Sequence, residues 1–215
     1  MKKIVSLSLL FLFILSSSFI CACVAKNSTV NTGTNKIAED EQLSSFEPFY
    51  VYEDFQSVKN HYLPSGWMGS IANLEMDPSY NGDSYSGRYC IKMVYKKGGL
   101  QKWSGIYWQY PENNWGDKKG GYNLTGAKKL TFLAKGAQGY EIISEVKVGG
   151  IRGNPYSDSC GVGLTKIKLT PNWKKYTIDL SKFDLSLIMG GFCIVFNDKD
   201  NPNGCTVYLD EIRYE

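Results

Sequence analysis

From residue 46 onward, apolar and polar positions alternate over short stretches, and glycine, asparagine, aspartate and proline interrupt them at close intervals. Residues 88–95 show the pattern most clearly, because every second side chain is apolar and would share one face of a strand: Tyr89, Ile91, Met93 and Tyr95. No long segment has the period of an amphipathic helix. Many short strands joined by turns are typical of a sandwich or barrel, so the pattern predicts an all-β fold, a β-sandwich.

The same alternation predicts strands at residues 49–55, 88–95, 103–110, 129–134, 140–148, 165–169, 174–179, 192–196 and 206–212. We expect the last two to form a hairpin across the polar loop 197–204. Asp198 and Asp200 are similar to the start of a calcium loop, but the twelfth position is Leu209 rather than a bidentate glutamate. A plain hairpin loop fits better.

The chain begins with the pattern of an export signal. Lys2 and Lys3 precede a largely apolar run over residues 4–20. The run ends at Cys21-Ala22-Cys23, which resembles a bacterial lipobox, where a small residue precedes the acylated cysteine. We therefore expect a signal peptide at residues 1–22 and an exported, membrane-anchored lipoprotein at the cell envelope or surface, acylated on Cys23. An ordinary cleaved signal or an uncleaved anchor is the alternative, since the apolar run is long enough to span a bilayer.

Residues 23–45 are rich in polar side chains and predict a flexible tether of roughly 25 Å. Residues 46–215 are long enough for one good core and predict a single domain. Without Lys2 and Lys3, the 24 basic residues fall to 22 against 21 acidic ones. No basic stripe stands out, so we expect no nucleic-acid partner, and we expect a monomer.

Besides Cys21 and Cys23, four cysteines remain: Cys90, Cys160, Cys193 and Cys205. Export permits disulfides, and four cysteines allow three pairings. In a symmetric final hairpin, Cys193 would face Tyr208, about 10 Å along the strand from Cys205 and beyond disulfide reach. The sequence leaves the pairing open.

Several phrases occur in an order that resembles the carbohydrate-binding modules with a galactose-binding-like β-jelly-roll fold. They are Tyr52-Glu53-Asp54-Phe55, the stretch 82–92, Leu124-Thr125-Gly126-Ala127, the stretch 130–136, the stretch 169–180 and Tyr208-Leu209-Asp210-Glu211-Ile212. The resemblance covers nearly all of residues 46–215. It implies non-catalytic glycan binding, although the same fold also serves structural and protein-binding roles.

The resemblance also implies one structural calcium ion between the first and last strands. It would carry the ligand role to Asp54, Asp83 and Asp210, with Gln56 where many relatives have an acid. A neutral amide gives calcium an oxygen but less charge. Asp210 has a second interpretation as an outward-facing polar residue of the last strand.

The densest aromatic stretch, residues 103–116, offers a sugar platform. In a strand, Trp103, Tyr107 and Gln109 share one face with Gly105, and the opposite face fills the core. The rings would stack on the C–H faces of a pyranose, the Gln109 amide would bond its hydroxyls, and Trp115 would extend the surface. The alternative is that these rings are buried packing between sheets.

A second cluster follows a predicted strand, in the glycine-rich loop 149–159. Arg152 and Asp158 could direct hydrogen bonds to sugar hydroxyls, or could form a salt bridge that only closes the loop. Trp67, between two glycines, is a candidate third wall of the site.

Catalytic patterns are weak. His61 is the only histidine, no Gly-x-Ser-x-Gly elbow occurs, and no ligand set has zinc spacing. Glu141 and Glu145 would lie roughly 13 Å apart along a strand, beyond the spacing of a glycosidase pair. The sequence therefore predicts a surface-anchored, non-catalytic binder of polysaccharide or oligosaccharide. A structural or protein-interaction module is the alternative, and a glycan-active hydrolase is the less favoured one.

Overall fold

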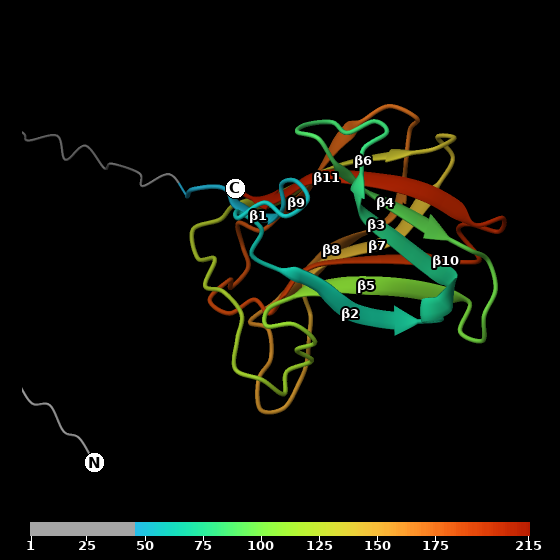
Figure 1. Ribbon diagram of the computed structural model, residues 1–215. Coiled ribbons are helices and arrows are strands. Elements are labelled where there is room, and N and C mark those ends of the chain that lie inside the picture. The colour runs from blue at the N-terminus through green and yellow to red at the C-terminus, as the bar shows by residue number, and fades with distance from the viewer. Residues whose placement is uncertain (1–45) are drawn as a thin grey trace, which may run out of the picture. The chain divides into compact units, whose positions relative to one another are not determined.

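The apolar faces of the strands come together between two antiparallel β-sheets, seen in a computed structural model that describes residues 46–215 (Figure 1). The first sheet has the order β3-β4-β11-β6-β9, and β1 also pairs with β11. Its strands are β1 (Phe49–Tyr52), β3 (Leu74–Tyr80), β4 (Cys90–Tyr95), β6 (Lys129–Gly136), β9 (Lys174–Asp179) and β11 (Cys205–Tyr214). The second sheet has the order β2-β5-β10-β7-β8. Its strands are β2 (Leu63–Gly69), β5 (Trp103–Gln109), β7 (Ile142–Gly149), β8 (Gly161–Lys168) and β10 (Gly190–Asn197).

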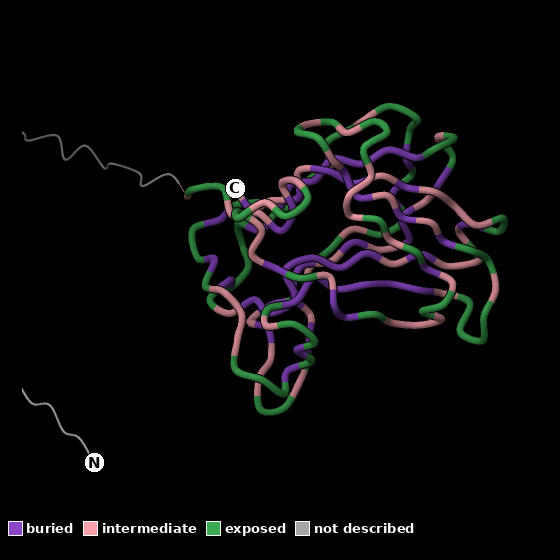
Figure 2. Tube along the Cα trace, in the orientation of Figure 1, coloured by how far each residue is buried: buried purple, intermediate pink, exposed green. Residues whose placement is uncertain are grey.

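The core lies between the sheets, where aromatic rings from both of them interlock. The ring of Trp108 on β5 meets that of Phe192 on β10 at 5.4 Å, and Phe192 meets Phe132 of β6 at 5.6 Å. All three side chains are almost fully buried. Each contributes roughly 1.5–3 kcal/mol through its removal from water. Figure 2 shows that buried residues run through the strands of both sheets.

The all-β prediction is confirmed, and each predicted strand is present. Two further strands, β2 and β3, were missed. Pro64, Gly66 and Gly69 interrupt the sequence of β2, and Pro78 interrupts that of β3. Both are edge strands of their sheets, which is where proline and glycine are tolerated inside a strand.

The predicted final hairpin is wrong. β10 lies between β5 and β7 in the second sheet, whereas β11 lies between β4 and β6 in the first. Residues 197–204 therefore cross from one sheet to the other. Both strands are central and bond neighbours on each side, so neither is free to pair with the other. Cys90, Cys160, Cys193 and Cys205 are all free thiols in this structure.

One short 3-10 turn, Ile71–Asn73, is the only helical element of residues 46–215. Nothing helical in that range has the length or apolar character needed to cross a bilayer. The predicted signal peptide, Cys23 and the tether lie outside the described residues.

Candidate functional site

The outer face of the second sheet carries a cleft of about 460 Å³. Strand register sets its floor. Tyr107 of β5 pairs with Cys193 of β10, which pairs with Lys147 of β7. One step along, Gly105, Val195 and Glu145 form the next row. Because side chains alternate across a strand, both rows point away from the core. Met68 of β2, opposite Gly105, completes the floor.

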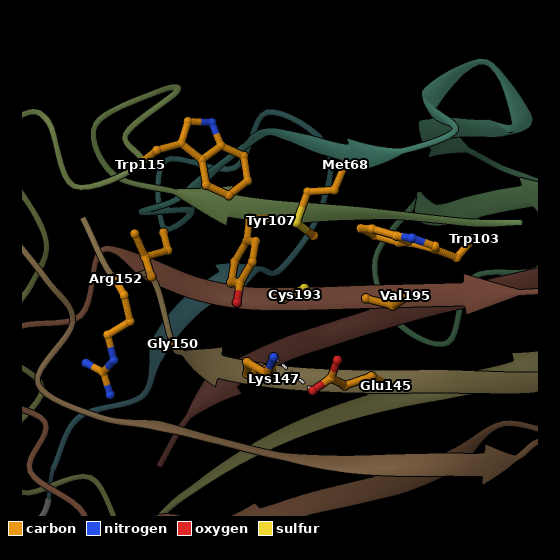
Figure 3. Close-up of a pocket in the computed structure, with 11 residues that line it drawn as sticks. Met68, Trp103, Tyr107, Trp115, Glu145, Lys147, Gly150, Arg152, Cys193 and Val195 are labelled. Carbon is orange, nitrogen blue, oxygen red and sulfur yellow. Dashed lines mark ion pairs between the residues drawn. The ribbon is translucent and has the colours of Figure 1, made fainter. Parts of the chain in front are cut away.

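Two tryptophans stand at opposite ends of this cleft. Trp103 opens β5 and is half-buried, while Trp115 comes from the loop after β5 and is 42 % exposed. Both line the cleft, with Tyr107 between them (Figure 3). The Tyr107 and Trp115 rings meet edge to face, with centroids 5.9 Å apart. Trp103 lies four residues from Tyr107, roughly 13 Å along the strand. The two tryptophan rings can therefore contact an elongated ligand at separate points.

A buried amide network holds the Trp115 loop in place. Gln109 is inaccessible to solvent, and its Nε2 donates to the backbone carbonyl of Asn114 at 2.8 Å. Ser65 Oγ donates to Gln109 Oε1 at 3.0 Å and accepts from the Asn113 N–H at 2.9 Å. The Asn114 Oδ1 in turn accepts from the Gly116 N–H at 3.0 Å. The residues on both sides of Trp115 are thus fixed by hydrogen bonds.

Two glycines allow the Trp115 loop to pack directly on the loop after β7. A Cβ at Gly116 would lie 2.3 Å from Gly153 Cα, closer than any real contact. The Tyr156 N–H donates to the Gly116 carbonyl at 2.9 Å across the same junction. Side chains at either glycine would separate the two loops and move Trp115 away from the cleft.

Trp103 is positioned by another glycine. Gly69 has a φ of +71° and lies against the Trp103 ring, where a Cβ would come within 2.9 Å of Cε3. The Ser70 N–H donates to the Trp103 carbonyl at 2.8 Å. Both tryptophans therefore depend on close backbone approach that only glycine permits.

Asp158 is buried and faces the protein rather than the cleft. Its carboxylate accepts from the N–H groups of Ile151 at 2.8 Å, Met189 at 2.5 Å and Gly190 at 3.3 Å. Burial raises the pKa of this carboxyl, and the three N–H donors and Arg152 act against that rise. Asp158 thus ties the loop after β7 to the start of β10.

Arg152 and Asp158 adopt neither of the two predicted arrangements, a shared ligand contact or a salt bridge. Arg152 is exposed at the cleft, and its Nη1 donates to the backbone carbonyl of Asp158 at 2.5 Å, not to the carboxylate. The Asp158 carboxylate already has its backbone partners, so the two side chains neither form a salt bridge nor point together at a ligand.

Of the sequence-predicted binding residues, the structure brings together Trp103, Tyr107, Trp115 and Arg152. Gln109 and Asp158 do not reach the surface, because the polar atoms of both side chains form hydrogen bonds inside the protein. Trp67 is 37 % exposed but pairs with Ile106, whose side chain enters the core. It therefore points to the opposite side of β2 from Met68 and lies outside the cleft.

Sequence reasoning missed Met68, Glu145, Lys147, Cys193 and Val195. Met68 lies in β2, which was not predicted, and the other four lie in predicted strands at alternating positions. Only the strand order places β2 and β10 next to β5, and β7 next to β10. Glu145 and Lys147 form an ion pair at 2.9 Å along one side of the cleft (Figure 3). Burial raises the pKa of the Cys193 thiol to about 12, so this part of the floor is neutral.

The four predicted calcium ligands do not fit a calcium site. Asp54 accepts from the N–H groups of Arg88 at 2.9 Å and Tyr89 at 3.1 Å. Asp210 accepts from those of Tyr85 at 2.9 Å and Ser86 at 3.1 Å. Calcium takes oxygen ligands, and here N–H donors are directed at both carboxylates.

The other two predicted ligands are also placed elsewhere. The Asp83 carboxylate forms an ion pair with Lys135, and Gln56 is exposed with a φ of +58°. Within residues 46–215, no three His, Cys, Asp or Glu side chains gather as a metal site would need. Asp54 and Asp210 instead accept hydrogen bonds from backbone N–H groups of the loop before β4 and so hold it in place.

The arrangement is a jelly-roll β-sandwich with an aromatic cleft on one sheet, and solved structures share this fold. A family 30 carbohydrate-binding module aligns with 80 % of this chain and 89 % of its own length, with a TM-score of 0.55 at 13 % identity. The family 30 carbohydrate-binding module of a cellulosomal cellulase of Clostridium thermocellum aligns with 79 % of this chain and 97 % of its own length. The TM-score is 0.54 at 14 % identity. No protein-family model and no curated protein matches the sequence. At these identities the likeness establishes the fold.

Proposed function

We propose that the cleft on the second sheet binds a polysaccharide or oligosaccharide chain without cleaving it. The observation that carries the proposal is the pair of solvent-accessible tryptophans, Trp103 and Trp115, held at the two ends of one open cleft. Flat rings present apolar surface to the C–H faces of a pyranose, and a ring at each end suits a chain better than a single sugar. The structural neighbours named as carbohydrate-binding modules support this reading of the fold.

Polar groups along the cleft complement the rings. Arg152 at one end and the Glu145–Lys147 pair at the side offer hydrogen-bond donors and acceptors to sugar hydroxyls. Two or three contacts of this kind leave a modest net free energy after the ordering costs of binding. We expect dissociation constants of about 10 μM to 1 mM.

The lining of the cleft favours binding over hydrolysis. Glycosidases position two carboxyl groups about the scissile bond. Among the described residues that line this cleft, Glu145 is the only carboxylate, and it is paired with Lys147. Glu141, the sequence candidate for a second acid, accepts instead from the N–H groups of Gln138 and Gly139, each at 2.7 Å.

We further propose that the domain is displayed from a membrane by lipid on Cys23. Cys23→Ser should then block metabolic incorporation of palmitate and leave the precursor unprocessed. Ordinary cleavage of that variant, with unchanged membrane partitioning, would exclude lipid anchoring. This part of the proposal is independent of the cleft.

A broad glycan array tests the binding proposal. The wild-type chain should be retained by at least one polysaccharide, and prolonged incubation should release no new reducing ends. Absence of retention across the array would refute glycan binding, and new reducing ends would show an enzyme instead.

A further inference from the structure

At its Trp103 end, the cleft adjoins another hollow. This second hollow has a volume of about 450 Å³, and Trp103 and Val195 line both. The second hollow is formed by residues next to β5, by β8 and by the crossing that follows β10. A glycan chain stacked on Trp103 can therefore continue along one surface from the cleft into the second hollow.

Three exposed lysines line this extension: Lys102, Lys166 and Lys199. None of them forms an ion pair with a described side chain of residues 46–215. Two of the three, Lys102 with a φ of +57° and Lys166 with a φ of +53°, have a left-handed backbone that residues with a Cβ rarely adopt. Such conformations concentrate at ligand-binding positions, where neighbouring structure enforces them.

Two carboxylates share the hollow but already have partners. Asp198 accepts from the Tyr95 hydroxyl at 2.6 Å and from the Gly98 N–H at 3.1 Å, and these bonds together lower its pKa. The Lys102 and Lys97 charges add to that lowering. Asp200 accepts from Asn197 Nδ2 at 2.9 Å. The three lysines outnumber these two carboxylates, so the hollow keeps one net positive charge. In the cleft, Glu145 and Lys147 balance one another and Arg152 adds a further positive charge.

We propose that the glycan bound here is anionic, with carboxylate or sulfate groups on the sugars that lie beyond Trp103. This inference rests on the proposed function and names the substrate class for the same site. Ammonium groups pair with either anion as point charges. Since the lysines are exposed, the attraction should be screened by salt, while the stacking on Trp103 and Trp115 is not.

Matched polysaccharide pairs test the proposal with the full chain. Polygalacturonate and its fully methyl-esterified form differ in free carboxylates, and a sulfated galactan and its desulfated form differ in sulfate. In low salt, the wild type should bind at least one anionic member about tenfold more tightly than its neutral partner, and high salt should remove the difference. The pair that shows the preference identifies the anion.

Two variants locate the effect. The triple variant Lys102→Gln, Lys166→Gln and Lys199→Gln should lose the preference for the anionic member of the pair. A control with the same change of net charge, Lys128→Gln, Lys168→Gln and Lys182→Gln, should keep the preference, because those lysines do not line either hollow. Lys166→Gly separates binding from folding, since glycine suits the left-handed backbone: it should weaken anionic binding without lowering the melting temperature.

The outcomes are distinct. Equal binding of both members by the wild type overturns the anionic assignment, while loss of that binding in Trp103→Ala leaves the proposed function in place. An equal effect of the control triple overturns the assignment to this hollow. Failure of the wild type to bind any member of either pair, together with an empty array, overturns both proposals.

Discussion

The Gln109 side chain donates to the backbone carbonyl of Asn114 at 2.8 Å and so connects the end of β5 to the loop that presents Trp115. Gln109 itself has no exposed surface. It therefore acts on the cleft through Trp115 and not through contact with a ligand.

Gln109→Ala should consequently weaken glycan binding at a distance. Removing the amide leaves Ser65 and the Asn114 carbonyl without their buried partner, at a cost of about 1–3 kcal/mol in the free energy of unfolding. In a Trp115→Ala background, the same substitution should cause no further loss of affinity, because residues that act through one group are not additive. The exposed Gln138→Ala serves as control. Additive losses of affinity would show that Gln109 acts independently of Trp115.

Tyr107 is predicted to behave as a core residue that also forms the floor of the cleft. It is only 5 % exposed, and its hydroxyl donates to the Gly149 carbonyl at 3.1 Å. Tyr107→Ala should lower the free energy of unfolding by roughly 3–5 kcal/mol, as for other buried aromatic residues. Tyr107→Phe should cost about 1 kcal/mol and retain binding. Denaturant unfolding measures both, and a wild-type stability for Tyr107→Ala would contradict the buried placement.

The buried Asp210 gives the fold a defined pH response. Burial raises the pKa of its carboxyl to about 6, although the N–H groups of Ser86, Tyr85 and Glu211 act in the opposite direction. The pKa of an aspartate in an unfolded chain is roughly 3.9, so the folded state binds the proton more tightly. This group's contribution to stability is therefore complete below about pH 3.9 and is lost as the pH rises through about 6.

Asp210→Asn removes that titration. The melting temperature of the wild type, relative to Asp210→Asn, should rise as the pH falls from about 7 to about 4.5. Parallel melting curves across this range, with a constant difference between the two proteins, would show that Asp210 is not perturbed in the folded state.

The same region predicts the response to calcium. Because N–H donors already satisfy Asp54 and Asp210, chelator and excess calcium should give the same melting temperature. A bound ion at a hundredfold excess over its dissociation constant would instead stabilise the fold by about 2.7 kcal/mol. A clear rise of the melting temperature with calcium, absent from Asp54→Asn, would restore the site that the family resemblance implies.

Features that depend on neighbouring residues could be predicted from the sequence, whereas features that depend on distant segments could not. Alternation along residues 103–109 correctly placed Trp108 in the core and Tyr107 on the opposite face, because strand periodicity is local. The same pattern could not show that Tyr107 lines the cleft and that Gln109 does not. That difference comes from Ser65 and Asn114, which reach Gln109 from other segments.

The order of the strands in the sheets was the second feature that the sequence could not predict. The alternation around Glu145 and Cys193 was visible in the sequence, but nothing local shows that β10 bonds to β5 and β7 rather than to β11. Likewise, Asp158 could be recognised as a loop acid, yet its three N–H partners come from Ile151, Met189 and Gly190. Trp115 was found from the density of aromatic residues over 103–116. Arg152 was found because loops positioned by a rigid scaffold commonly carry binding residues.

If Trp103 and Trp115 together bind a glycan chain, binding measurements on three tryptophan variants should separate these two residues from Trp67. Trp103→Ala, Trp115→Ala and the control Trp67→Ala each remove one solvent-accessible tryptophan, but only the first two line the cleft. On the polysaccharide that retains the wild type, Trp103→Ala and Trp115→Ala should each lose at least about tenfold in affinity, or 1.4 kcal/mol, with cooperative melting preserved. Trp67→Ala should bind like the wild type. Equal affinity of all three variants, or loss only in Trp67→Ala, would show that Trp103 and Trp115 do not bind the glycan.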